Sequence, residues 1–377
     1  MSTAGPLDGI RIIEVGHMLA GPYCGLMLAD MGAEVIKIET PEGDIARSVS
    51  PHFIGPHNAY FASLNRSKKS VVLDLASVEG QEALGRIAET SHAVITNLRP
   101  SAIRKLGLTY DAMRQWNERI VCVALTGYGL DGPHADSPAY DYVIQALTGV
   151  MALTGDPDAP PTKAGYSAVD NSAGLVAAVG LLAKIVQGQG GQVDVAMYDV
   201  MLSQLNYLAG AVLNAGETMA RQADSSHPYV VPAQIFPTAD GWLTLFITHD
   251  KFWKIFCDEV GHSEWTTDAR FCTMAGRRAH RTEVIAAIAQ LLRGAPAAEW
   301  VRRLVPLGVV AAEVGTLNDA LCGDIATARR LVVSLGDGSL PLQAVASPIR
   351  FDGFTPRYGL PPLLNEHADE VLGKVIA

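Results

Sequence analysis

Short apolar runs and helical stretches alternate along the first part of the chain. Residues 10–15 and 34–38 form apolar runs of strand length, and residues 21–30 between them have the pattern of a helix. Pro22 suits the first turn of that helix, where its missing N–H is not needed. A strand, a helix and a strand at this spacing predict a βαβ unit and therefore a parallel sheet.

The same alternation continues to about residue 125. We expect strands at 70–75, 93–97 and 120–125, and helices at 78–90 and 110–117. A loop rich in Pro, Gly and His is expected at 41–58. The pattern predicts the α/β class, with a large Rossmann-like domain built on a doubly wound parallel sheet.

Helical patterns dominate the next part of the chain. We expect a helix over 140–154, an apolar helix after Asp170, a strand at 193–196 and a long helix over 199–215. Later, residues 242–248 have a strand pattern, and helices are expected at 249–260, 281–292 and 296–304.

The length of 377 residues exceeds what a single core usually supports, so we expect two domains. The predicted boundaries place the first part of a large domain at 1–205 and a linker at 206–226. A smaller α/β domain follows at 227–320, and residues 321–377 return to complete the large domain.

Charge and cysteine content narrow the possible partners. The net charge of −10 argues against nucleic acid and anionic membranes as main partners. The five cysteines are scattered without a CxxC motif, which is typical of a reducing compartment. The first residues lack the pattern of a signal peptide, and the apolar run 173–186 looks too short to span a bilayer. We expect a cytoplasmic protein that does not associate with membranes.

Asp170 is the main candidate for chemistry. It stands between a Gly-Tyr-Ser turn and the predicted apolar helix. An aspartate there has a structural interpretation as the N-cap of the helix. It also has a functional interpretation, because the free N–H groups of a first helical turn can stabilise an oxyanion beside it.

Other motifs for chemistry are absent or weak. The sequence contains no HExxH metal motif, GxSxG elbow or Walker loop, so no metal is expected. The glycines at 127, 129 and 132 match GxGxxG but lead into a Pro-rich loop rather than a helix, which indicates a turn. Basic residues near strand ends are either phosphate contacts or solvated surface charges: Lys37, Arg47, Lys68, Lys69, Arg99, Arg104 and Lys105.

A series of motifs spans nearly the whole chain in a fixed order. They are GPLDGIRIIEV at 5–15, LAGP at 19–22, LADMGAEVIKIE at 28–39, YF at 60–61, LNRSKKS at 64–70, NLRP at 97–100, TGYG at 126–129, YD at 140–141, VDVAMYD at 193–199 and PPLL at 361–364 followed by Glu366 and His367. By these motifs the chain resembles the family III CoA-transferases, typified by formyl-CoA:oxalate and carnitine CoA-transferases.

The resemblance implies a mechanism and a set of CoA contacts. The nucleophilic aspartate of the family falls on Asp170, which would form an acyl anhydride and then an aspartyl-CoA thioester, with CoA as substrate and no other cofactor. The positions that match CoA contacts of the family are His17, Met18, Ala20, Leu73, Asn97, Leu98, Arg104, Lys105 and Met197. Thr40 and Ala76 stand where relatives carry basic residues.

The resemblance also bears on the acceptor pocket and the assembly. Tyr140, His227 and His249 are candidates for the substrate pocket, and a basic or histidine-containing pocket would suit a dicarboxylate. The glycine-rich loop of the family should fall at 246–251, where this sequence has no glycine. Succinyl-CoA is the expected donor, a free carboxylic acid the acceptor, and an interlocked homodimer the expected assembly.

Two other functions remain open. An α-methylacyl-CoA racemase shares the fold but uses a histidine and an acidic residue where this chain has Tyr140 and His249. A CoA-binding protein without catalysis would use Asp170 only as a helix cap.

Overall fold

The computed structural model describes residues 4–376, and the chain divides into two compact units. The larger unit contains residues up to 148, residues 165–215 and residues from 324 onward. The smaller unit contains residues 149–164 and 216–323. This division assigns residues 149–164 to the smaller unit and residues 206–215, expected as part of a linker, to the larger one.

Within the described residues, the larger unit is built on a six-stranded parallel sheet in the order β5-β2-β1-β6-β7-β8. The strands are β1 (Arg11–Val15), β2 (Glu34–Glu39), β5 (Lys69–Val72), β6 (Ala93–Thr96), β7 (Val121–Thr126) and β8 (Gly191–Ala196). Strand order reverses between β1 and β6, as in the doubly wound nucleotide-binding folds. The predicted α/β class is confirmed.

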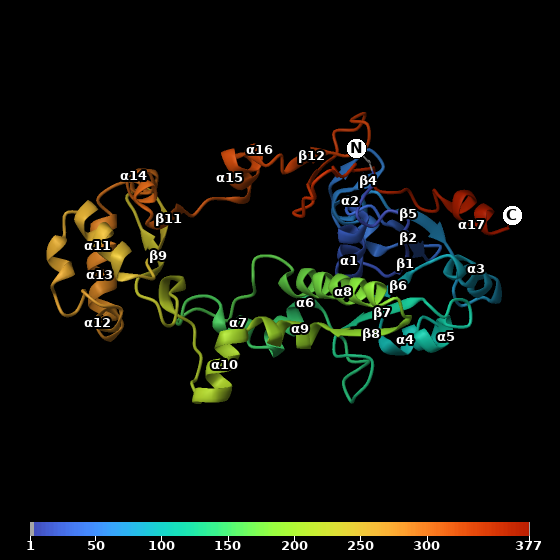
Figure 1. Cartoon of the computed structure of the whole chain (residues 1–377), viewed down its shortest axis with the longest axis horizontal. Coiled ribbons are helices and arrows are strands. Elements are labelled where there is room, and N and C mark those ends of the chain that lie inside the picture. The colour runs from blue at the N-terminus through green and yellow to red at the C-terminus, as the bar shows by residue number, and fades with distance from the viewer. Residues whose placement is uncertain (1–3, 377) are drawn as a thin grey trace. The chain divides into compact units, whose positions relative to one another are not determined.

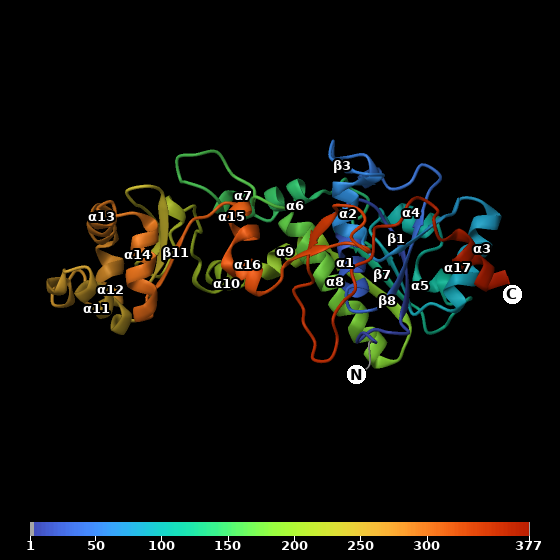
Figure 2. The same cartoon turned by 90° about the horizontal axis from the view of Figure 1, so that it is seen from above.

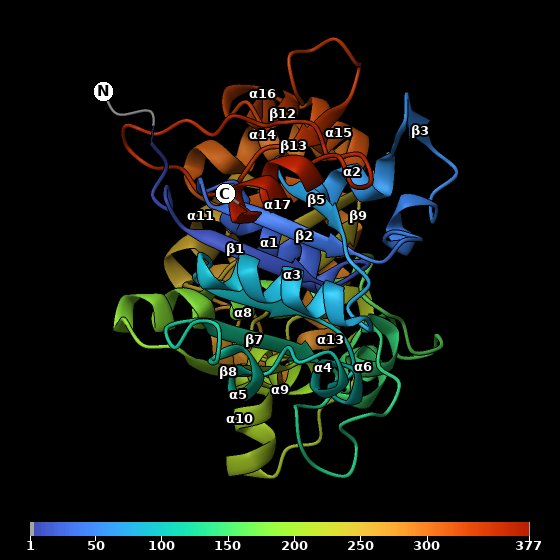
Figure 3. The ribbon, with the colours of Figure 1, turned by 90° about the vertical axis from the view of Figure 1, so that its right-hand side faces the viewer.

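Helices cover both faces of this sheet (Figure 1). One face carries α1 (Ala20–Ala29) and α8 (Ala168–Gln187). The other carries α3 (Val78–Glu89), α4 (Pro100–Lys105), α5 (Tyr110–Met113) and α17 (Ala368–Ile376), which Figures 2 and 3 show on the side away from α1. Strand side chains alternate between the faces, so Ile13 and Val15 join the core under α3 while Glu14 points toward α1.

Two long helices expected from the sequence are interrupted. The region expected at 140–154 forms α6 (Asp141–Leu147) and α7 (Val150–Leu153), because Gly149 between them adopts a left-handed conformation with φ of 85°. The region expected at 199–215 forms α9 (Met197–Gln204) and α10 (Asn206–Ala215). Apolar periodicity continued across both breaks, so the pattern alone did not reveal them.

Helix α8 is longer than the apolar run in the sequence indicated. It has 20 residues and, by length and composition alone, could cross a membrane, which corrects the expectation that the run is too short. A single such helix is weak evidence, since core helices of soluble proteins share these properties. Here α8 packs closely on α1: a Cβ at Gly174 would lie 2.8 Å from the carbonyl oxygen of Ala20.

The loop expected at 41–58 contains short elements. They are η1 (Ile45–Arg47), β3 (Phe53–Ile54) and β4 (His57–Asn58), and α2 (Ala59–Asn65) follows them. Asn58 caps α2, because its side chain accepts a hydrogen bond from the backbone N–H of Tyr60. This cap fixes Tyr60 in the first turn of α2.

The smaller unit has its own sheet and core. Its antiparallel strands are β9 (Ala233–Pro237), β10 (Trp242–Phe246) and β11 (Val310–Glu313), in the order β11-β10-β9. Its helices include α11 (Asp250–Glu259), α12 (Met274–Ala279), α13 (Arg281–Leu292) and α14 (Ala297–Leu304). The sequence pattern had indicated β10, α11, α13 and α14 but neither of the outer strands.

The last part of the chain returns to the larger unit. After α15 (Leu317–Cys322) come α16 (Asp324–Ala328), β12 (Val332–Ser334) and β13 (Gln343–Val345). Residues near 365 then lie along β5: Asn365 Oδ1 accepts a hydrogen bond from Val72 N at 2.8 Å, and Asn365 N donates to Ser70 Oγ at 3.1 Å. The tail therefore protects the edge of the parallel sheet.

Candidate active site

The loops that follow β1 and β6 meet at the point where strand order reverses, which is where open α/β sheets bind ligands. Asn97, after β6, holds the loop after β1 from one side. Its Oδ1 accepts a hydrogen bond from His17 N at 3.0 Å, and its Nδ2 donates to His17 O at 2.9 Å. The approach requires glycine at position 16, because a Cβ there would lie 2.3 Å from Asn97 Oδ1.

Asp44 holds the same loop from the other side. Met18 has a φ of 63°, a left-handed conformation that is uncommon for a residue with a side chain. Asp44 Oδ1 accepts hydrogen bonds from Met18 N at 3.1 Å and from Ala46 N at 2.9 Å. We call residues 16–18 the His17–Met18 turn.

Four buried charged groups lie beneath this turn. Glu14, between the two lysines, accepts from Lys37 Nζ at 3.0 Å and from Lys68 Nζ at 2.7 Å, and Lys37 Nζ also pairs with Asp44 Oδ2 at 2.9 Å. We call Glu14, Lys37, Asp44 and Lys68 the buried ion network. Both interpretations from the sequence are therefore wrong for Lys37 and Lys68. Neither lysine contacts a phosphate site or solvent, because both are buried in ion pairs.

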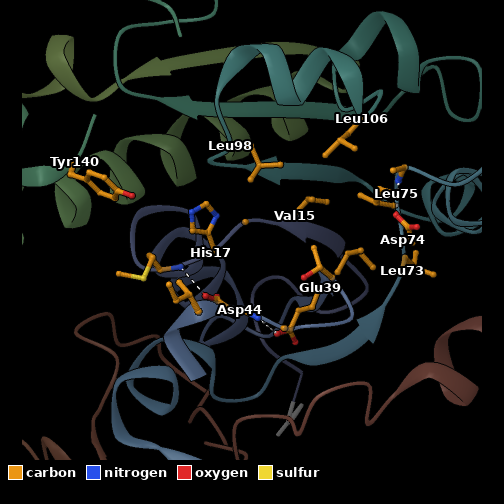
Figure 4. A pocket seen from close by; sticks show the side chains of 17 residues that line it. Val15, His17, Glu39, Asp44, Leu73, Asp74, Leu75, Leu98, Leu106 and Tyr140 are labelled. Atoms are coloured by element: carbon orange, nitrogen blue, oxygen red, sulfur yellow. Dashed lines mark hydrogen bonds between the residues drawn. The ribbon is translucent and has the colours of Figure 1, made fainter. Parts of the chain in front are cut away.

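A cavity of about 580 Å³ opens on one side of the turn (Figure 4). His17, Met18, Leu73, Leu98 and Tyr140 contribute to its wall. Three acidic residues also line it: Glu39, Asp44 and Asp74. Within the described residues, no lysine or arginine lines this cavity. Thr40 and Ala76, where relatives were expected to carry basic residues, are among the lining positions.

A second cavity, of about 390 Å³, contains Asp170. It shares His17, Met18, Leu98 and Tyr140 with the first cavity. Its other lining residues include Ala20, Tyr60, Asn97, Arg99 and Met197. The turn thus forms a common wall between a largely apolar cavity and the cavity with the candidate nucleophile.

Asp170 is not the N-cap of α8. The N-cap is Ser167, whose side chain makes no capping hydrogen bond, and Asp170 stands three residues further on, in the first turn. The cap is supplied by Asp141, whose Oδ2 accepts a hydrogen bond from Val169 N at 2.9 Å. The structural interpretation of Asp170 as a cap is therefore wrong, and its carboxylate faces the cavity instead.

The first-turn amides of α8 are partly engaged. Ala168 N donates to Tyr166 O, Val169 N to Asp141 Oδ2, and Asn171 N to Ser167 O. These three N–H groups already have acceptors, so they are not free to stabilise an oxyanion. Tyr60, in the same cavity, has a hydroxyl that can donate a hydrogen bond.

The electrostatics of the cavity favour a neutral resting state. Burial, and then the nearby Asp141 carboxylate, raise the pKa of Asp170 to about 7. Burial raises the pKa of Tyr60, and Asp170 adds to this effect, so the phenol keeps its proton. Burial lowers the pKa of His17 despite the opposing effect of Asp44, so the imidazole is neutral at pH 7. Asp170 can therefore switch between acid and carboxylate near neutral pH.

The structure separates the candidate residues into groups. His17, Met18, Ala20, Leu73, Asn97, Leu98 and Met197 line one or both cavities, as does Tyr140. Arg104 and Lys105 line neither, and Arg104 pairs with Asp131 at 2.9 Å. His227 and His249 belong to the smaller unit.

The two histidines of the smaller unit have different environments. His227 Nδ1 accepts hydrogen bonds from Tyr229 N and Val230 N. His249 is exposed at the N-cap of α11, where its side chain makes no capping hydrogen bond.

Tyr60 and Arg99 were not predicted as contacts of the reacting groups. Tyr60 lies within the YF motif and Arg99 within NLRP, so the sequence did carry a signal for both. Their position in the same cavity as Asp170 could not be predicted from the sequence. Helix α2 brings Tyr60 into the cavity of Asp170, although the two residues are far apart in the chain.

The GxGxxG match forms a turn rather than a dinucleotide site. Gly129 and Gly132 have φ of 92° and 100°, and the chain reaches its next helix only at Asp141. Among the residues that the structure describes, no group of three or more His, Cys, Asp or Glu is placed to hold a metal ion.

A sequence profile decides the family. The profile described as CoA-transferase family III matches residues 7–368. The chain belongs to CoA-transferase family III. As a family III CoA-transferase it is an enzyme whose substrates are CoA thioesters.

Individual relatives agree with this assignment. The family III CoA-transferase described here is 34% identical to the succinate–glutarate CoA-transferase of Agrobacterium fabrum, over 98% of this chain and 96% of the relative. It is 32% identical to the succinyl-CoA:mesaconate CoA-transferase of Haloarcula marismortui, over 98% and 96% of the two chains. The crystal structure of a CaiB/BaiF family protein from Brucella suis superposes with a TM-score of 0.87, at 30% identity, over 99% of this chain and 100% of the other.

Proposed function

We propose that this CoA-transferase works through covalent intermediates on Asp170. The Asp170 carboxylate attacks the thioester carbonyl of the donor acyl-CoA, the C–S bond breaks, and CoA leaves as thiolate from a mixed anhydride. The thiolate then attacks the aspartyl carbonyl, which releases the donor acid and leaves an aspartyl-CoA thioester. The acceptor carboxylate attacks this thioester, which expels CoA thiolate and forms a second mixed anhydride. The thiolate then attacks the acceptor acyl carbon, which gives the acceptor CoA thioester and frees the Asp170 carboxylate.

The observation that supports this proposal most directly is the position of Asp170. It is a poorly solvated carboxylate in a cavity that also contains Tyr60, Asn97 and Met197. A nucleophile that divides a difficult acyl transfer into easier steps needs such a site. Asp141 takes over the capping of α8, so the Asp170 oxygens are not used as the cap. The adjoining cavity of about 580 Å³ shares a wall with that of Asp170, and we propose it as the path of part of the CoA molecule.

We further propose succinyl-CoA as the donor and a dicarboxylic acid as the acceptor. The names of two relatives pair succinate or succinyl-CoA with a second dicarboxylic acid, glutarate or mesaconate. Arg99 lines the cavity of Asp170 and offers a guanidinium to a distal carboxylate. The assignment of His227 and His249 to the acceptor pocket stays a prediction from the sequence.

Trapping during turnover tests the covalent steps. The protein is incubated with succinyl-CoA and then treated with hydroxylamine or borohydride, and peptides are analysed by mass spectrometry. We expect modification at Asp170 alone, because only that carboxylate carries the acyl group. The Asp141→Asn variant serves as a control, since it should still be modified at Asp170. Modification elsewhere, or an Asp170→Ala variant that exchanges CoA at the parent rate, would refute the mechanism.

A panel of acceptors tests the substrate proposal. The enzyme is incubated with succinyl-CoA and each of a series of mono- and dicarboxylic acids, and new CoA thioesters are detected by mass spectrometry. We expect transfer to dicarboxylates to exceed transfer to monocarboxylates of equal length. Acetyl-CoA as donor provides the control for donor preference.

Two alternatives are separated by simple assays. Incorporation of deuterium at the α-carbon of a 2-methylacyl-CoA would indicate racemase chemistry, for which Tyr140 is a poor acid–base group. Binding of CoA without acyl exchange for any donor and acceptor would indicate a binding protein without catalysis.

We also propose that the enzyme is a cytoplasmic homodimer. The resemblance suggests interlocked subunits, and exposed apolar side chains on α8 and α10 of the larger unit are compatible with coverage by a second chain: Val179, Val186 and Leu213. Light scattering after size-exclusion chromatography should give twice the chain mass, and a monomer would refute the dimer.

A further inference from the structure

The buried ion network collects charges from four separate segments of the larger unit. Glu14 comes from β1, Lys37 from β2, Asp44 from the loop after β2, and Lys68 from the residue before β5. All four are buried, with side-chain exposures of 0% for Glu14, Lys37, Asp44 and Lys68 in their ion pairs. Two carboxylates and two ammonium groups balance each other in charge.

Both lysines also bind backbone oxygens next to the cavities. Lys37 Nζ donates to Gly16 O at 2.9 Å, and Lys68 Nζ donates to Pro22 O at 2.8 Å. Gly16 begins the His17–Met18 turn, and Pro22 lies in the first turn of α1. The network is thus bonded to the backbone on both sides of residues 17–21.

Asp44 connects the network to the strained residue of the turn. Its Oδ2 pairs with Lys37, while its Oδ1 accepts the N–H of Met18. Burial alone would raise the pKa of Asp44, but Lys37 and the N–H groups of Ala46 and Met18 outweigh it and hold the pKa below its usual value. Asp44 is therefore a charged acceptor, which binds an N–H more strongly than a neutral one.

Such an arrangement is costly unless it fixes a geometry. A residue other than glycine in the left-handed region is strained and persists only where its surroundings determine it. Buried ion pairs contribute little net stability over apolar packing of the same volume. Met18, which the network holds through Asp44, lines both cavities, as does the neighbouring His17. The left-handed Met18 and the buried ion pairs, both of which are costly, therefore lie together at the wall between the two cavities.

We propose that the buried ion network is a positioning device for acyl-CoA, with Asp44 as its positioning residue: it holds the His17–Met18 turn in its left-handed shape and thereby sets the path of CoA between the two cavities. This inference rests on the proposed function, because it assumes that CoA occupies these cavities. Asn97 holds the turn from the opposite side through its two hydrogen bonds to the His17 backbone.

The first test compares two variants that each remove one buried carboxylate. Asp44→Asn keeps the shape of the side chain, but its amide faces Lys37 without charge. Asp30→Asn breaks the buried pair with Arg66 at the opposite end of α1, and serves as the matched control. We expect Asp44→Asn to raise the KM for acyl-CoA about tenfold, with kcat falling much less, and Asp30→Asn to leave KM unchanged.

The split between KM and kcat separates positioning from loss of fold. A variant that only unfolds part of the protein lowers the active fraction, and so lowers kcat at constant KM. Equal KM values for Asp44→Asn and Asp30→Asn would overturn the proposal.

A double-mutant cycle tests whether Asp44 acts through Met18. Glycine adopts a positive φ without strain, so in a Met18→Gly background the turn needs less support. Calorimetry gives the factor by which Asp44→Asn raises the dissociation constant of CoA in each background. We expect this factor to be at least about threefold smaller in the Met18→Gly background than in the parent. An identical effect in both backgrounds would show that Asp44 does not act through the turn.

Hydrogen–deuterium exchange gives a measurement without ligand. In Asp44→Asn the peptide covering residues 16–20 should exchange faster than in the parent, while peptides of β7 stay unchanged. If the parent does not bind CoA, the proposed function fails, and this exchange still decides the positional claim. If the parent binds CoA and residues 16–20 exchange at the parent rate in the variant, the positional claim alone fails.

Discussion

The larger unit buries two groups of charges, and they differ in composition. The buried ion network contains two carboxylates and two ammonium groups in contact with one another. The pair Asp141 and Asp170 contains two carboxylates, and Asp141 raises the pKa of its neighbour. Balanced charges compensate one another and can fix a backbone geometry, whereas like charges leave one group in an unfavourable ionised state. The first arrangement suits positioning and the second suits reactivity.

Replacing Asp170 should have the largest effect, because it removes the group that we assign to the chemistry. We expect Asp170→Asn to lower kcat by about four orders of magnitude or more, as loss of a nucleophile usually does. The dissociation constant of CoA should stay close to that of the parent, because the cavity walls are unchanged. Steady-state assays with succinyl-CoA and calorimetry with CoA check both values. A residual rate within about tenfold of the parent would contradict the assignment.

Breaking the balanced group should cost stability rather than chemistry. Glu14→Gln leaves Lys37 and Lys68 without their shared carboxylate, and we expect the free energy of unfolding to fall by about 3–5 kcal/mol. Native-state hydrogen exchange of the β2 amides measures this in the larger unit alone.

The matched control for Glu14→Gln is Glu34→Gln. It breaks partly exposed pairs with Arg11 and Lys69 at the start of β2, the strand that pairs with the β1 strand of Glu14. We expect it to cost less than about 1 kcal/mol. Equal losses in the two variants would show that the network has no special role in stability.

Removing the ionisable group of Asp170 should raise the free energy of unfolding, whereas Glu14→Gln should lower it. In the unfolded chain Asp170 ionises near its ordinary pKa of 3.8, but in the folded protein near 7. The unfolded state therefore releases its proton first as pH rises, so the parent loses stability between about pH 4 and pH 7.

Asp170→Asn has no such group and should escape this loss. A difference of one between folded and unfolded pKa values corresponds to about 1.4 kcal/mol, so we expect a gain of about 2–4 kcal/mol at pH 8. The gain should shrink toward pH 4. Hydrogen exchange or thermal melting at pH 5 and pH 8 measures it, and a gain independent of pH would contradict the raised pKa.

Neutralising Asp141 should have the smallest effect. Burial is the larger cause of the raised pKa of Asp170 and remains in Asp141→Asn, while the repulsion disappears. The acid limb of kcat/KM for acyl-CoA, which in the parent should rise through about pH 7, should therefore move to lower pH. Asp111→Asn, an exposed carboxylate on α5, is the control that should leave the limb in place. A limb that moves upward would refute the electrostatic account.

The sequence predicted the parts of the fold whose signal is local. The apolar runs at β1, β2 and β7 have the period and length of buried strands, and the boundaries of α13 follow from its amphipathic pattern. The interruption of the helix at Gly149 was missed because apolar periodicity continues across it. The strands β9 and β11 were missed because turn-rich sequence flanks them.

The site was predictable to the extent that single residues carry it. Asp170 stood out by its place before an apolar helix, and resemblance supplied the cavity residues. The buried ion network was not predictable, because Lys37 and Lys68 meet Glu14 only after three strands have assembled. A lysine at a strand end has the same sequence signature whether it faces solvent or a buried carboxylate.

The hydrogen bonds between Asn365 and β5 have a consequence during protein synthesis, because the strand is made long before the residue that covers it. Val72 and Asn365 bond to each other across 293 positions of sequence. At ribosomal speeds of about 5–20 residues per second, strand β5 leaves the ribosome roughly 15–60 seconds before its covering tail exists. During that interval the nascent sheet presents an open edge to other polypeptides. A chaperone that shields this edge would thus act on the first half of the chain and be displaced by its last few residues.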